Sequence, residues 1–156
     1  RINIMKNITF IILVLFLYSC GYSSIYKNQK SQNFQINIIE AKGNSEMNNL
    51  IKSEIKLYSG KDTANIYNLK IDTDYIKETL TKDSAGVITD YKLSVTSIFT
   101  IDLKEKTQVI EFKETINIKN QSDYFQQNTY EKDIKKIFAS SIRQKLVSEI
   151  FNINDN

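Results

Sequence analysis

The sequence of 156 residues contains no histidine and a single cysteine, Cys20. Histidine is the commonest general base at neutral pH and the commonest transition-metal ligand in proteins. Zinc sites built on histidine or on several cysteines are therefore excluded. One thiol cannot form a disulfide within the chain, so the position of Cys20 needs another explanation.

Glycine is scarce too, with four residues in the chain. We find neither a glycine-rich loop for phosphate groups nor a nucleophile elbow, and we predict no cofactor and no metal. Catalysis by carboxylates alone remains open. The formal net charge of +3 falls to +1 if residues 1–19 are removed with Arg1 and Lys6. A chain without a strong overall field is not expected to bind nucleic acid.

An apolar run precedes Cys20. The ten residues 8–17, ITFIILVLFL, are apolar apart from Thr9, and such a run covers about half of the ~30 Å hydrocarbon core of a bilayer. We therefore interpret residues 1–19 as a signal peptide, with Met5 as the true start and Lys6 as its positive residue. An uncleaved N-terminal anchor with an incidental cysteine is the alternative.

The residues Leu17-Tyr18-Ser19-Cys20 resemble the lipobox of bacterial lipoproteins, which has Leu three positions before the Cys and a small residue directly before it. The resemblance implies that Cys20 carries acyl chains and becomes the mature N-terminus. Each buried CH₂ contributes about 0.8 kcal/mol, so several chains anchor a protein durably. Gly21, where some bacteria place an aspartate to retain lipoproteins at the inner membrane, implies the outer membrane.

The rest of the chain divides into a polar tether after Cys20 (residues 20–33), one domain (34–151) and a frayed tail (152–156). Residues 34–39, FQINII, alternate between apolar and polar and predict a strand. The next segment predicts an amphipathic helix that Asn44 or Ser45 caps and Gly60 ends. Its apolar stripe comprises Met47, Leu50, Ile51, Ile55 and Tyr58.

Three segments, 67–75, 91–103 and 110–118, alternate with a strict period of two, which is typical of strands with one wet and one buried face. The segment 76–90, with Gly86, predicts a protruding hairpin, and residues 104–107, KEKT, predict a second one. Glu114 interrupts the apolar face of the last strand. We interpret it as a strand-end or bulge position rather than as a buried catalytic acid.

The C-terminal segment predicts a long helix capped by Asn128 or Thr129, with Glu131 and Asp133 near its positive end. Its apolar stripe comprises Ile134, Ile137, Phe138, Ile142, Leu146 and Ile150. The element order is thus β-α-β-β-β-α. We predict an α+β two-layer sandwich, with both helices on one face of a four-stranded, mainly antiparallel sheet.

Taken together, the lipobox, the short tether and this element order resemble the lipopolysaccharide-assembly lipoproteins of the LptE family. The resemblance spans residues 20–151; its best local features are Asp90-Tyr91 and the helix opening with Glu131, Asp133 and Ile134. It implies a periplasm-facing outer-membrane protein that is not an enzyme. Such a protein plugs and helps to assemble the β-barrel lipopolysaccharide translocon, an LptD-like partner, and binds lipopolysaccharide itself.

The family associates lipopolysaccharide contact with basic residues in the protruding hairpin and just before the last helix. Here these would be Lys77, Lys82 and Lys132, since Asn128 occupies the second place and Lys132 is the nearest cation. Lysine would suit the lipid A phosphates as a cation. The alternative is that these lysines are simply solvated.

Two other functions remain open at this stage. The chain could be another outer-membrane lipoprotein that acts as an accessory or scaffold of an envelope assembly machine. It could also be a lipid-anchored hydrolase that uses Asp72 and Asp74, which share one strand face about 7 Å apart.

Overall fold

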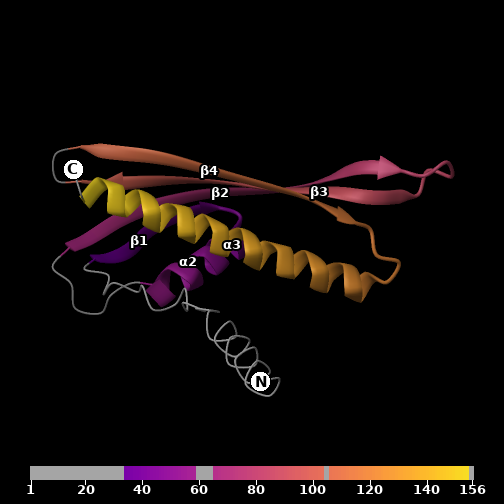
Figure 1. The fold of residues 1–156 in the computed structure, drawn as a ribbon, viewed down its shortest axis with the longest axis horizontal. Helices are drawn as coiled ribbons and strands as arrows, with labels where there is room; N and C mark the ends of the chain where they lie inside the picture. Colours follow the sequence, from indigo (N-terminus) through magenta and orange to yellow (C-terminus); the bar gives the residue numbers. More distant parts are fainter. Residues whose placement is uncertain (1–33, 59–64, 104–105, 155–156) are drawn as a thin grey trace, which may run out of the picture. The chain divides into compact units, whose positions relative to one another are not determined.

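The structure is a computed structural model and describes residues 34–58, 65–103 and 106–154. Its elements follow the order β-α-β-β-β-α, as the sequence predicts (Figure 1). They are β1 (Phe34–Gly43), α2 (Ser45–Tyr58), β2 (Asn65–Lys82), β3 (Ile88–Asp102), β4 (Thr107–Lys119) and α3 (Tyr124–Asn154). The signal peptide, Cys20, the tether and Gly60 lie outside the described residues.

The four strands form one sheet in the order β1-β2-β3-β4. β2 and β3 pair antiparallel, as do β3 and β4. β1 and β2, which α2 connects in the chain, pair parallel. The sheet is therefore mixed but mainly antiparallel. Figure 1 shows α2 and α3 on the same side of this sheet, which leaves the other face of the strands open.

The core fills the space between the sheet and the two helices. Of the alternating residues that the sequence assigns to the inner faces, Leu69, Ile71, Leu93, Val95, Phe99, Ile101 and Ile118 are buried. The tyrosines, Leu103 and the other inner-face apolar residues of β4 are half-buried against this core. The stripes of the two helices close the other side with Met47, Ile51, Ile55, Ile134, Phe138, Ile142, Leu146 and Ile150. The structure therefore confirms the two-layer architecture that the hydrophobic patterning predicted.

Ile137 does not belong to this core, because its side chain is 54% exposed. The large buried residues of α3, from Ile134 to Ile150, follow one another four positions apart, so the buried stripe turns by about 40° around the helix at each step. Ile137 is three positions after Ile134, and three positions turn by about 60° in the opposite sense. The prediction that Ile137 joins the stripe was wrong for this reason.

The helix ends also differ in part from the sequence prediction. Asn44 caps α2, as predicted, since its Oδ1 accepts a hydrogen bond from the Met47 amide at 2.9 Å. α3 is capped by Asp123, whose Oδ1 accepts from the Gln126 amide at 2.8 Å, so the predicted caps at residues 128 and 129 were wrong. α3 also continues to Asn154, through residues assigned above to the tail.

The β2–β3 hairpin closes in a tight turn around Asp83 and Gly86. Asp83 Oδ1 accepts hydrogen bonds from the amides of Ala85 and Val87, both at 2.9 Å, and Gly86 has a φ of 81°. This turn chemistry allows both strands to continue to the tip. In Figure 1 the hairpin extends past the beginning of α3, which agrees with the predicted protrusion.

Of the helices in the part of the chain that the structure describes, neither has the length and apolar composition that crossing a membrane requires.

Candidate functional site

The face of the sheet that the two described helices leave uncovered, here called the open face, carries most of the exposed side chains of the strands. Alternation along the strands places every second side chain on this face, opposite the helices. Registered rows run across it, for example Asp72, Ile98 and Glu111, or Asp74, Thr96 and Lys113. The sequence predicted this wet face from the alternation alone, and the structure confirms it.

Charges of both signs are interspersed on this face. Lys92 Nζ lies 3.4 Å from Glu78 Oε2 across β2 and β3, and Lys42 Nζ lies 3.0 Å from Glu40 Oε1 on β1. A hollow of about 130 Å³ indents the centre of the face, with a lining of Asp74, Ile76, Glu78, Lys92, Ser94, Thr96 and Lys113. A mixed polar surface of this kind can bind another polar surface through hydrogen bonds without a large apolar patch.

Lys77 is held in the sheet, not in the hairpin loop. It lies in β2, where its Nζ makes an ion pair of 2.7 Å with Glu131 Oε2 of α3 and stands 4.3 Å from the centre of the Tyr91 ring. Its side chain is 31% exposed. A phosphate group that binds Lys77 must therefore compete with the Glu131 carboxylate.

Lys82 and Lys132 are exposed. Lys82 is the last residue of β2 at the hairpin tip, and Lys132 lies in α3 directly after Glu131. Five strand positions separate Lys77 from Lys82, which corresponds to about 16 Å. The three lysines therefore do not converge on one compact anion site.

Glu131 is the centre of a polar cluster that joins β2, α2 and α3, here called the Glu131 cluster. Tyr75 donates a hydrogen bond from its hydroxyl to Glu131 Oε1 at 3.0 Å. Lys135 lies 3.8 Å from Glu131, pairs with Glu46 of α2 at 2.7 Å and stands over the Tyr75 ring. The cluster also includes Lys77 of β2, and its contacts connect both helices to the sheet.

Burial raises the pKa of the Glu131 carboxyl, but the hydrogen bonds from Lys77 and Tyr75 and the charges of Lys77 and Lys135 outweigh burial and hold the pKa below its ordinary value. Burial, and then the hydrogen bond to Glu131, raises the pKa of the Tyr75 hydroxyl. Tyr75 therefore remains a neutral donor to an ionised carboxylate. The cluster thus holds Glu131 in its ionised form.

Sequence reasoning missed this cluster because it assigned Glu131 to the helix dipole. α3 begins at Tyr124, so Glu131 lies beyond its first turn, which contains no acidic residue. The partner Lys77 is 54 positions away in the chain. One feature of the sequence could have indicated the cluster. Tyr75 and Lys77 continue the inner-face alternation of β2 beyond Thr73, so the last inner-face residue of this series carries a charge that needs a partner on the helix side.

Glu114 lies in the middle of β4, where the pairing with β3 shows no register shift, so the strand-end or bulge interpretation was wrong. Its Oε1 accepts a hydrogen bond from Ser141 and pairs with Lys145, both at 2.7 Å. Burial opposes ionisation of Glu114, but Lys145 and Ser141 lower the pKa of its carboxyl on balance. Two groups of α3 thus satisfy a carboxylate on the inner face.

Asp72 and Asp74 are exposed on the open face of β2, opposite Ile98 and Thr96. Carboxyl groups that catalyse hydrolysis act as a pair around a bound substrate, in a site that sets their pKa values apart. Asp74 borders the hollow described above, and that hollow also contains Lys92 and Lys113. Within residues 34–58, 65–103 and 106–154, no group of acidic residues is arranged to hold a metal ion.

The elements of the described residues define a two-layer α+β domain in which the helices cover one face of the sheet and leave the other face uncovered. No protein-family model matches the chain, and no curated protein matches it in sequence. Solved structures do match. The rare lipoprotein B of Shewanella oneidensis aligns with a TM-score of 0.56 and 17% identity over 77% of this chain and 98% of the other.

Two further structures have the same architecture. Lipoprotein B of Nitrosomonas europaea aligns with a TM-score of 0.56 and 8% identity, over 81% of this chain and 90% of the other. A minor lipoprotein of Acinetobacter baumannii aligns with a TM-score of 0.51 and 11% identity, over 71% and 89%. At these identities the comparisons establish a shared fold, which this chain has in common with solved bacterial lipoproteins.

Proposed function

We propose that the mature chain is a lipid-anchored protein of the bacterial outer membrane. In this proposal it docks in the lumen of the β-barrel lipopolysaccharide translocon and helps to assemble it. The observation that carries the proposal is the open sheet face, which extends over four strands, is mixed in charge and is largely polar, with scattered exposed apolar residues such as Ile98 and Val109. The interior of a large barrel is polar, so such a face is chemically suited to it.

Two other findings support the anchor and the envelope location. The residues up to Cys20 resemble a lipobox, and the solved proteins that share the fold are bacterial lipoproteins. A role without catalysis agrees with the absence of histidine from the sequence. Contact with lipopolysaccharide is part of the proposal, with Lys82 and Lys132 as the exposed cations and Lys77 as one that Glu131 must release.

Docking through the open face can be tested by co-purification. The substitution Thr96→Trp adds a bulky ring at the centre of the face, beside the hollow. The full chain with T96W is expected to recover at least about tenfold less barrel protein from detergent-solubilised membranes than the wild type, because shape complementarity is lost. Quantitative mass spectrometry of the purified complex measures the loss.

Gln144→Trp is the matched control, because Gln144 is an exposed residue of α3 rather than of the sheet. It adds the same ring, and normal recovery of the barrel is expected. Equal recovery with T96W and Q144W would contradict docking through the open face. Absence of any large barrel from the wild-type purification would favour the accessory or scaffold function.

A further inference from the structure

The two edges of the sheet differ in how they oppose pairing with another strand. The edge strand β1 has a register shift between Ile38 and Glu40 and carries the exposed pair Glu40 and Lys42 near its end. Bulges and charges of this kind are the usual protection of an exposed edge. β4, the other edge, also carries charged residues, but it has no bulge: it pairs with β3 residue by residue from Thr107 to Lys119 without a shift, and the chain contains no proline.

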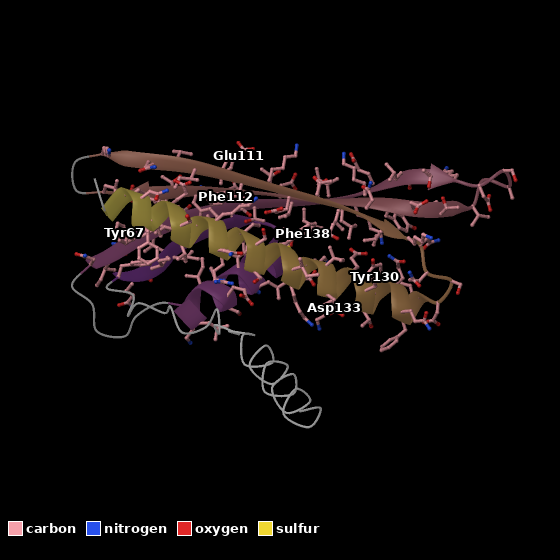
Figure 2. The ribbon with its side chains drawn as sticks, in the orientation of Figure 1. Tyr67, Glu111, Phe112, Tyr130, Asp133 and Phe138 are labelled. Carbon is pink, nitrogen blue, oxygen red and sulfur yellow. The ribbon has the colours of Figure 1, made fainter. Side chains whose placement is uncertain are left out.

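The inner face of β4 is also incompletely covered. Its partner β3 contributes Leu93, Val95, Phe99 and Ile101 at 0% exposure, whereas the apolar residues of β4 in the neighbouring rows, Ile110, Phe112 and Ile116, are half-buried. Figure 2 shows Phe112 on the helix side of β4 and Glu111 on the open side. The apolar layer therefore reaches the edge half-covered at Ile110, Phe112 and Ile116, where Glu114 interrupts it, and it is fully buried at Ile118.

We propose that β4 pairs antiparallel with β4 of a second copy of this chain, with Phe112 on the two-fold axis. A two-fold axis of this kind places residue 112 opposite itself and Glu111 opposite Lys113, twice. Both side chains are exposed on the open face. Val109 then meets Thr115 and Thr107 meets Asn117, so no like charges face each other on the open side of the interface.

The charge pattern selects this register over its neighbours. Moving the axis by one residue toward the start of β4 places Glu111 opposite itself, and moving it by one toward the end places Lys113 opposite itself. Like charges directly opposite each other destabilise strand pairing, whereas opposite charges stabilise it. The selected register joins two four-stranded sheets into one of eight strands and brings the two Phe112 side chains together on the inner face. There Ile116 lies opposite Gln108, and Ile110 lies opposite Glu114, whose charge Lys145 of α3 offsets.

Charge reversal tests the register. In Glu111→Lys or in Lys113→Glu, both attractive pairs become like-charge pairs, and the dissociation constant of the dimer is expected to rise by about 30-fold. The double variant E111K/K113E restores opposite charges in both pairs and is expected to dimerise like the wild type. An equimolar mixture of E111K and K113E is expected to form a mixed dimer. Sedimentation velocity of the full chain in detergent, over a concentration series, measures each constant.

Lys119→Glu is the matched control, because Lys119 lies on the same strand beyond the paired stretch and is expected to leave dimerisation unchanged. Circular dichroism establishes that each variant is folded. A wild-type chain that is monomeric throughout the series would overturn the proposal. So would a dimer that both single reversals leave intact, or a folded double variant that stays monomeric. The inference does not depend on the proposed docking of the open face.

Discussion

Glu131 shows at the scale of a single residue how this domain is held together. Its carboxylate accepts hydrogen bonds from Lys77 and Tyr75 of β2 and lies near Lys135, which reaches Glu46 of α2. Its side chain is 15% exposed, so these contacts are only partly screened by water. One residue of α3 thus connects three elements beyond the end of the apolar core.

Replacing Glu131 with Gln is expected to change how stability depends on pH. Because the folded protein holds the pKa of Glu131 below its ordinary value of 4.5, the ionised carboxylate stabilises the fold above that pH. This stabilisation is lost as the pH falls through the lowered pKa. The variant E131Q should be about 1–2 kcal/mol less stable than the wild type at pH 7, with a difference that shrinks in acid. Urea denaturation at a series of pH values measures both effects.

Asp102→Asn is the control for this experiment, since Asp102 is an exposed carboxylate on the open face of the sheet. Its stability is expected to follow the wild-type profile over the same series. If E131Q lost stability in parallel with the wild type down to strongly acid pH, the ion pair would not be the source of the stabilisation.

At the scale of elements, two glycines with nearly equal backbone angles have different tasks. Gly43, at the end of β1, has a φ of 79°, and Gly86, in the β2–β3 turn, has a φ of 81°. A Cβ at position 43 would collide with the carbonyl oxygen of Thr73, while a Cβ at position 86 would meet open space. Gly43 therefore allows both a positive φ and the close approach of the β1 and β2 backbones, whereas Gly86 is required only for the positive φ of the turn.

The substitution Gly86→Ala is expected to destabilise the fold by about 1 kcal/mol, the cost of an alanine at positive φ. Gly43→Ala carries the same cost and also forces the β1 end away from β2, so we expect a loss of about 3 kcal/mol or more. Thermal or urea denaturation of the two variants measures the difference. Equal losses would show that the approach of Gly43 to Thr73 does not constrain the fold.

The sequence predicted the elements well where the signal is local. The period of two in β2, β3 and β4 identifies strands because neighbouring side chains alternate between the two faces whatever the partner strand is. Nothing local indicates that β1 pairs parallel with β2, or that its register shifts after Ile38. The cap of α3 was misplaced for a related reason. Asp123, the true cap, precedes Tyr124 and Phe125, which are exposed and interrupt the amphipathic pattern.

The candidate site was less predictable than the fold, because its contacts join distant parts of the chain. Glu114 accepts a hydrogen bond from Ser141, 27 positions later in the chain, and Lys77 pairs with Glu131, 54 positions later. Taken alone, each of these residues interrupts the local pattern of its strand. The sequence therefore suggested a bulge or strand end at Glu114 and a loop at Lys77. The open face, in contrast, was predictable, since it is the complement of the buried alternation.

At the scale of the whole molecule, the domain combines a closed and an open side. The helices cover one sheet face and bury the apolar residues, and the described helices leave the other, largely polar face uncovered. The same arrangement occurs in solved bacterial lipoproteins. Our account assigns the open side to the lumen of the lipopolysaccharide translocon.

Surface display of lipopolysaccharide after depletion of this protein tests that assignment most directly. We expect the amount of lipopolysaccharide at the cell surface to fall and lipopolysaccharide to accumulate inside the cell. The wild-type chain and Q144W should restore display, whereas T96W should not. Undiminished surface display after complete depletion would contradict the account.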